Sequence, residues 1–80
     1  MPIPVSARAI MKVGISERQF SGTLGEQILR YLSLDPIDRR HTTITVSSVV
    51  DLPGWGSPRT YLDPEAIRDL ARAMSSRGLI

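Results

Sequence analysis

The sequence has no cysteine and a single histidine, His41, among its 80 residues. The absence of cysteine excludes a disulfide framework, a thiolate metal site and a thiolate nucleophile. This composition fits a reducing compartment, so we expect a cytoplasmic protein. His41 has no carboxylate at ligand spacing, so we expect it to lie in solvent at the start of a strand and not to bind a metal.

The sequence also lacks a long apolar run. No segment approaches the roughly 18 apolar residues of a membrane span, and residues 1–5 lack the basic leader of a signal peptide. We therefore expect no membrane partner and one small domain over residues 1–80. A chain of this size buries only a modest core, so a partner or a second copy can contribute to its stability.

Charge of one sign does not dominate the sequence. Ten basic and eight acidic side chains leave a net charge of +2, and Lys12 is the only lysine among the basic residues. Arginine binds carboxylate or phosphate as a bidentate fork, which suits contacts with protein or nucleic acid. A GC-rich genome also favours arginine codons, and both explanations remain open.

Residues 3–15 alternate between apolar and other side chains, with Ile10 as the exception. Their apolar members are Ile3, Val5, Ala7, Ala9, Met11, Val13 and Ile15. This period of two predicts a half-buried strand. Thirteen residues are long for one strand, so we expect a bend or bulge and an end at Gly14.

Two capping boxes compete for the start of the helix that follows, one at Ser16 and one at Thr23. A start at Ser16 places two glycines inside the helix, at a cost of roughly 1 kcal/mol each. We therefore predict a short helix from Thr23 to near Ser33, with residues 16–22 as a loop or a frayed first turn.

The second half repeats the pattern of strand and helix. Asp35-Pro36 ends the first helix, and residues 35–41 form a polar connection. Residues 42–50 are rich in β-branched side chains and predict a strand that turns Ile44, Val46 and Val50 inward. Two prolines and two glycines predict a loop over residues 52–58.

The last helix has a signal at each end. Asp63 is placed to cap it and Pro64 fits its first turn, while Gly78 ends it. Its apolar stripe consists of Ile67, Leu70, Ala71 and Met74. We also predict that Leu79 folds back onto Met74.

These segments predict an α+β domain in the order strand, helix, strand, helix, with two helices on one face of a small sheet. The two long strands pair antiparallel, or a right-handed crossover makes them parallel. A homodimer that pairs strands would cover an exposed sheet edge.

Most of the candidate binding residues are arginines. The full set of candidates is Arg39, Arg40, Trp55, Pro58, Arg59, Arg68 and Arg72. Arg68 and Arg72 are one helical turn apart and share a face, to which Arg59 and Arg77 can add. Lys12 can join Arg39 and Arg40 in a second basic patch. The alternative is a solvated face on which Glu65 and Asp69 pair with the arginines.

The roles of Trp55 and Pro2 are not decided by the sequence. Trp55 lies between two glycines and is either a lid on the core or an exposed anchor for a partner. Pro2 and the first strand loosely resemble small tautomerases, in which an amino-terminal proline acts as general base or nucleophile. No other catalytic arrangement is present, so we expect a protein without enzymatic activity or cofactor.

Residues 43–80 resemble the start of a ParB-like amino-terminal domain. The shared pattern is a strand (residues 44–49), a loop, Pro58-Arg59, an apolar Leu62 and the capped helix from Asp63. The resemblance implies that Pro58 and Arg59 border a nucleotide pocket. The family's next strand, its Gly-Glu-Arg-Arg motif and its helix-turn-helix do not follow in this sequence.

The sequence therefore predicts a small binding module whose partner is a protein complex or a nucleic acid. One version is a ParB-like piece that acts in DNA partition or related nucleic-acid handling. The other is a stand-alone phage or mobile-element protein of the anti-CRISPR type, which docks on a host nucleic-acid-processing complex.

Overall fold

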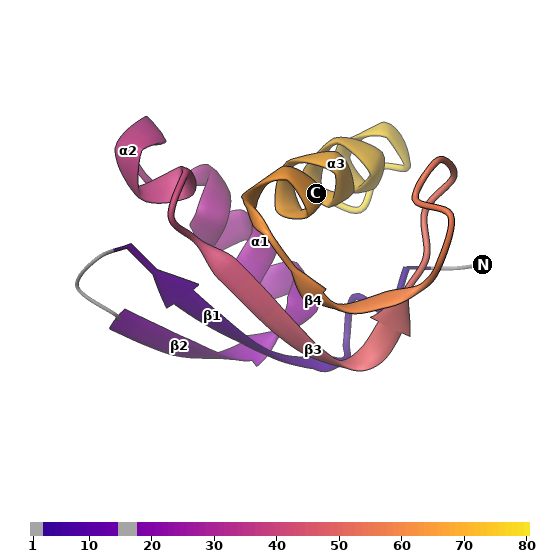
Figure 1. The fold of residues 1–80 in the computed structure, drawn as a ribbon, viewed down its shortest axis with the longest axis horizontal. Coiled ribbons are helices and arrows are strands. Elements are labelled where there is room, and N and C mark those ends of the chain that lie inside the picture. Colours follow the sequence, from indigo (N-terminus) through magenta and orange to yellow (C-terminus); the bar gives the residue numbers. More distant parts are fainter. Residues whose placement is uncertain (1–2, 15–17) are drawn as a thin grey trace.

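The computed structural model describes residues 3–14 and 18–80, which form an α+β fold with a four-stranded sheet (Figure 1). Its elements are β1 (Arg8–Val13), β2 (Arg18–Thr23), α1 (Leu24–Leu32), α2 (Pro36–Arg39), β3 (Thr43–Val50), β4 (Arg59–Leu62) and α3 (Pro64–Ser76). The predicted class is confirmed, whereas the predicted order lacked β2, α2 and β4.

The sheet has the order β2-β1-β3-β4, and every neighbouring pair is antiparallel. The two predicted strands, β1 and β3, therefore lie side by side in antiparallel register, and the parallel crossover does not form. Met11 lies opposite Phe20 on one side and Ile44 on the other, and Ile44 lies opposite Leu62. These side chains form one inward row across the sheet.

The first strand is shorter than predicted. Residues 3–7 form a turn, in which the Ala7 N–H donates to the Pro4 carbonyl at 3.0 Å, and β1 begins at Arg8. The Gly25 N–H donates to the Val5 carbonyl at 2.9 Å, so this segment satisfies a free amide at the start of α1. Alternation in sequence could not reveal that partner. Ile15 lies outside the described residues.

β2 corrects the predicted loop at residues 16–22, of which residues 16 and 17 lie outside the described part. Gly22 made this segment a poor strand candidate, since glycine weakens strands. A Cβ at Gly22 would lie 3.3 Å from Glu26 Oε2 and 3.4 Å from Gln27 Nε2. The glycine therefore lets α1 approach the sheet closely.

The predicted start of α1 at Thr23 is confirmed. The Glu26 N–H donates to Thr23 Oγ1 at 3.2 Å, and the Thr23 N–H donates to Glu26 Oε1 at 3.4 Å. The helix ends at Leu32 with Ser33 as its C-cap, close to the predicted end. Pro36 then begins the short helix α2, where we predicted only a polar connection.

α3 has both predicted ends. The Ala66 N–H donates to Asp63 Oδ1 at 2.7 Å. At the other end Gly78 has φ 72°, and the Leu79 N–H donates to the Met74 carbonyl at 2.8 Å. The Leu79 side chain stays 45% exposed, however, and Ile80 packs against the core in its place.

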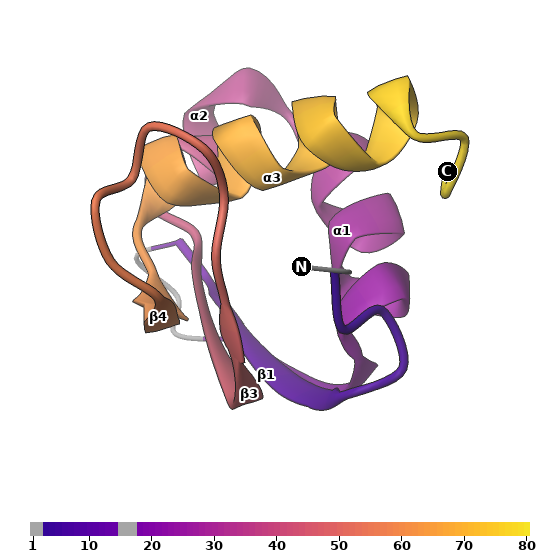
Figure 2. The same cartoon turned by 90° about the vertical axis from the view of Figure 1, so that its right-hand side faces the viewer.

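The two long helices cover one face of the sheet. α1 packs on β1 and β2, and α3 packs on β3 and β4 (Figure 2). The core lies between these layers, and none of the described helices covers the other face of the sheet. Among residues 3–14 and 18–80, no helix is long and apolar enough to cross a membrane.

Candidate functional site

A groove runs between α1 and α3 on the outer side of the helical layer. We call it the helix groove. It is lined by Leu29, Tyr31, Leu32, Pro36, Arg39, Arg68, Ala71, Arg72, Ser75, Ser76 and Ile80. Three helices and the chain end after α3 therefore contribute to one surface.

The α1 side of the groove is apolar because this helix carries two adjacent pairs of apolar residues. Ile28 and Tyr31 are buried in the core, and their neighbours Leu29 and Leu32 remain 56% and 41% exposed. A helix turns neighbouring side chains about 100° apart, so one face cannot bury both members of a pair. Neither leucine was predicted as a site residue, although the two adjacent apolar pairs are visible in the sequence.

The opposite side of the groove carries exposed arginines. Arg68 and Arg72 both line it from α3, as their spacing of one turn predicts. A neighbouring hollow is lined by Arg39, Arg40 and Arg68, together with Glu65. The structure thus brings Arg39, Arg40, Arg68 and Arg72 together along one edge of the helical layer.

Arg39 uses part of its guanidinium to hold the fold. Its Nη2 donates to the Leu32 carbonyl at 2.6 Å, and its guanidinium carbon lies 5.8 Å from the centre of the Tyr31 ring. The side chain therefore satisfies a carbonyl at the end of α1 and fixes α2 beside that helix. Arg40 is exposed.

The predicted alternative of internal pairing with Glu65 and Asp69 does not describe this surface. Asp69 Oδ2 lies 3.4 Å from Trp55 Nε1 and accepts its hydrogen bond. Within the described part of the chain, no hydrogen bond or ion pair joins Arg68 or Arg72 to a carboxylate. Both guanidiniums are therefore available to a partner.

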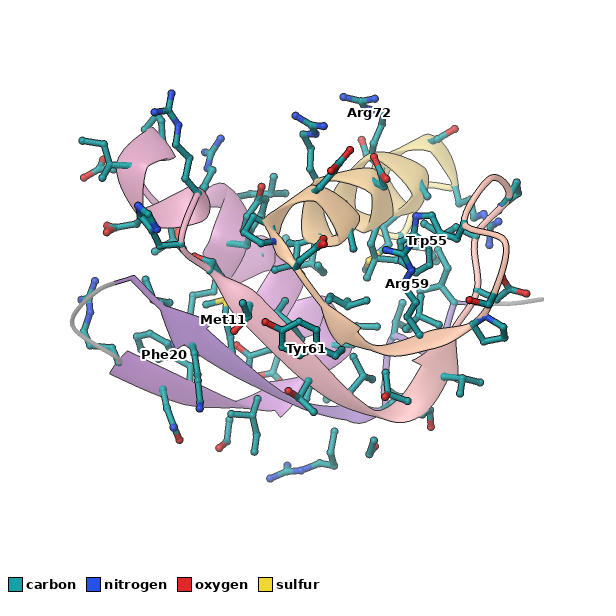
Figure 3. All side chains as sticks on the ribbon, in the orientation of Figure 1. Met11, Phe20, Trp55, Arg59, Tyr61 and Arg72 are labelled. Atoms are coloured by element: carbon teal, nitrogen blue, oxygen red, sulfur yellow. The ribbon has the colours of Figure 1, made fainter. Side chains whose placement is uncertain are left out.

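Trp55 acts as a lid and not as a free anchor. It is half-buried and packs against the core, and its ring lies 4.7 Å from the guanidinium carbon of Arg59 (Figure 3). Asp69 and Arg72 line the hollow beside Trp55, on the other side of α3 from the helix groove. Pro58 and Arg59 line neither this hollow nor the groove.

The other predicted residues lie elsewhere. Lys12 is exposed on β1 and faces away from the helices, so it is separate from Arg39 and Arg40. His41 is exposed just before β3, as predicted. No group of three metal-ligating side chains is found among the described residues. Pro2 lies outside them.

Comparison of the chain with protein-family models, with curated proteins and with solved structures found no match.

Proposed function

We propose that this protein is a non-enzymatic binding module whose helix groove docks an acidic amphipathic segment of a partner protein. The observation that carries the proposal is the composition of the groove. Leu29 and Leu32 are exposed on one side, and on the other Arg68 and Arg72 have no carboxylate partner among the residues that the structure describes. A helix with one apolar and one acidic face complements this arrangement.

The two sides of the groove have different parts in binding. Burial of Leu29 and Leu32 supplies affinity, because it removes apolar surface from water. Exposed ion pairs contribute only about 0.2–1 kcal/mol each. Arg68 and Arg72 therefore select a partner of negative charge and speed its approach more than they tighten the complex.

The leucines favour a protein partner over a nucleic acid. Phosphates could bind the arginines, but a nucleic-acid backbone offers nothing that covers Leu29 and Leu32. The interpretation as a stand-alone inhibitor is compatible with this surface, since an apolar groove flanked by arginines can dock an acidic amphipathic helix of a host complex. The proposal includes no cofactor.

The test measures binding of labelled helical peptides by fluorescence anisotropy. One peptide carries leucines at helical spacing with an acidic opposite face, a second carries lysines on that face, and a third is a scrambled version of the first. We expect the acidic amphipathic peptide to bind most tightly. The double variant Leu29→Gln, Leu32→Gln should weaken it by about tenfold or more, which corresponds to about 1.4 kcal/mol.

The double variant Arg68→Gln, Arg72→Gln should reduce the preference for the acidic over the basic peptide. Ile10→Gln changes an exposed apolar residue on the opposite side of the protein and serves as the matched control. Equal binding of the scrambled peptide, or unchanged binding by the leucine variant, would refute the proposal. Tighter binding of duplex DNA at the same arginines would favour a nucleic-acid partner there.

A ParB-like module in DNA partition is the second candidate function. It is supported by the succession of β3, a loop, β4 and the capped α3, which follows the order of the family pattern. This candidate predicts that cytidine triphosphate shifts the NMR signals of residues around Pro58 and Arg59, but not those of Leu29. Signals that stay unchanged at millimolar nucleotide would rule it out.

A further inference from the structure

Within residues 3–14 and 18–80, the charged side chains of the strands are all positive. They are Arg8, Lys12, Arg18 and Arg59, and the four described strands contain no aspartate or glutamate. The described carboxylates all lie in helices, caps and loops. The sheet thus differs from the helical layer, where acidic and basic residues alternate along α3.

Two of these cations, Arg8 and Lys12, lie on the helix-free face of the sheet together with an aromatic ring, whereas Arg18 and Arg59 are opposite buried Val13 and Val50 and belong to the other face. We call the helix-free face the open face, and its central residues are Arg8, Ile10, Lys12, Ser21, Thr45 and Tyr61. All six are exposed. Tyr61 is 59% exposed and Ile10 is 46% exposed, and Figure 3 shows the Tyr61 ring in front of β3.

The register sets how these side chains lie. Ile10 is opposite Ser21 on one side and Thr45 on the other, and Thr45 is opposite Tyr61. One row therefore crosses all four strands. Arg8 and Lys12 flank Ile10 along β1, about 13 Å apart at about 3.3 Å per residue, and Tyr61 lies about 10 Å across the sheet from β1.

We infer that the open face binds single-stranded nucleic acid, with a base stacked on Tyr61 and phosphates at Arg8 and Lys12. Aromatic rings and cations together are the usual contacts for unpaired nucleotides. Thr45 lies between β1 and Tyr61, and Ser21 lies on the other side of β1; the hydroxyls of both can donate to or accept from base edges. Among the described residues, no helix projects from this face toward a duplex groove, and the exposed Tyr61 ring offers its surface to a base that is not already stacked in a duplex, so unpaired bases are favoured.

A second copy does not fit this face. Two open faces packed together would bring Arg8 and Lys12 of each copy toward like charges, and the strands as described hold no carboxylate to compensate. Of the described residues on this face, only Ile10, Val49 and Tyr61 would offer large apolar groups. Nucleic acid complements the charge instead.

The test uses the whole protein and fluorescein-labelled dT12 and U12 oligonucleotides at 50 mM and 200 mM salt. Release of counterions from two phosphate contacts predicts about sevenfold weaker binding at the higher salt. Tyr61→Leu should weaken binding by at least about fivefold, the lower end of the range for stacking on one base. Arg8→Gln, Lys12→Gln should remove most of the salt dependence.

The matched control is Arg18→Gln, Arg77→Gln, which removes the same charge from exposed positions outside the open face and the helix groove and should bind the oligonucleotides like the wild type. Circular dichroism checks that each variant is folded. The inference is overturned by equal binding of a 12-base-pair duplex, by an unchanged affinity of Tyr61→Leu, or by an equal loss in the control. Binding to phosphatidylserine vesicles without binding to oligonucleotides would overturn it in favour of a lipid surface.

This inference does not rest on the helix groove. The open face and the groove lie on opposite sides of the protein, so the oligonucleotide assay can fail while the peptide assay succeeds, and the reverse.

Discussion

At the scale of single residues, Gln27 has an unusual part in this small core. It is fully buried, and its Nε2 donates to the Ala9 carbonyl at 3.2 Å and to the Phe20 carbonyl at 2.9 Å. Both acceptors belong to the sheet, so one side chain ties α1 to β1 and β2. Gly22 leaves the space in which the amide lies.

Replacement of Gln27 by methionine tests this tie. The side chain keeps its approximate size but leaves the Ala9 and Phe20 carbonyls without the donor. We expect a loss of about 1–3 kcal/mol in the free energy of unfolding, measured with urea. Gln19→Met on the exposed side of β2 is the control and should change stability by less than about 0.5 kcal/mol. Equal losses in the two variants would contradict the argument.

The part played by Gln27 could not be predicted from the sequence. A glutamine three residues after Leu24 and next to Ile28 only interrupts an apolar stripe. Its acceptors are carbonyls of β1 and β2, and one of these strands was itself predicted as a loop. A polar residue on the inward face of a helix is informative only once the surface beneath it is known.

At the scale of elements, the two proline-started helices differ in their caps. Asp63 accepts from the Ala66 N–H at the start of α3, whereas Asp35 at the start of α2 makes no such hydrogen bond with its side chain. Aspartate is thus the N-cap residue of both helices, but its side chain accepts a capping hydrogen bond only at the start of α3.

This pair gives a controlled test of capping. Asp63→Ala should lower the free energy of unfolding by about 1 kcal/mol, the typical value for the loss of an N-cap. Asp35→Ala should change it much less, because no hydrogen bond is lost. Urea unfolding measures both variants. If Asp35→Ala lowers the free energy of unfolding as much as Asp63→Ala does, the hydrogen bond from the Ala66 N–H to Asp63 is not the cause of the loss.

Elements with local signals were predicted well, and elements that depend on neighbours were not. α1, α3 and β3 are specified by caps and by β-branched composition, which a short window of sequence contains. β2 and β4 exist because β1 and β3 offer them backbone partners. Gly22 argues against a strand until the approach of α1 explains it, and β4 has only four residues.

At the scale of the whole molecule, the residues predicted as binding candidates lie in two separate places. Spacing along α3 predicted that Arg68 and Arg72 share a face, and the fold adds Arg39 and Arg40 to them. Trp55, Pro58 and Arg59 lie on the other side of α3, because the loop folds there, and Arg72 borders both the helix groove and the hollow beside Trp55. The open face was not predicted, since it requires four strands in one register and two of them were not predicted.

A homodimer that pairs edge strands stays a prediction. β2 and β4 are the edges of the sheet, and a partner strand could add to either. Size-exclusion chromatography with light scattering at several protein concentrations measures the mass directly. A mass of one chain throughout would exclude the dimer.

The two proposed surfaces lie on opposite sides of one small core, which makes their independence a prediction in itself. Sites separated by the whole thickness of a domain, with no shared residues, usually act additively. A saturating amount of the acidic peptide should therefore change the affinity for dT12 by less than about twofold, since a coupling free energy near zero leaves each affinity unchanged. The measurement is the anisotropy of labelled dT12 with and without unlabelled peptide. Displacement of the oligonucleotide by the peptide would mean that both compete for the arginines of α3, and that the open face is not the nucleic-acid site.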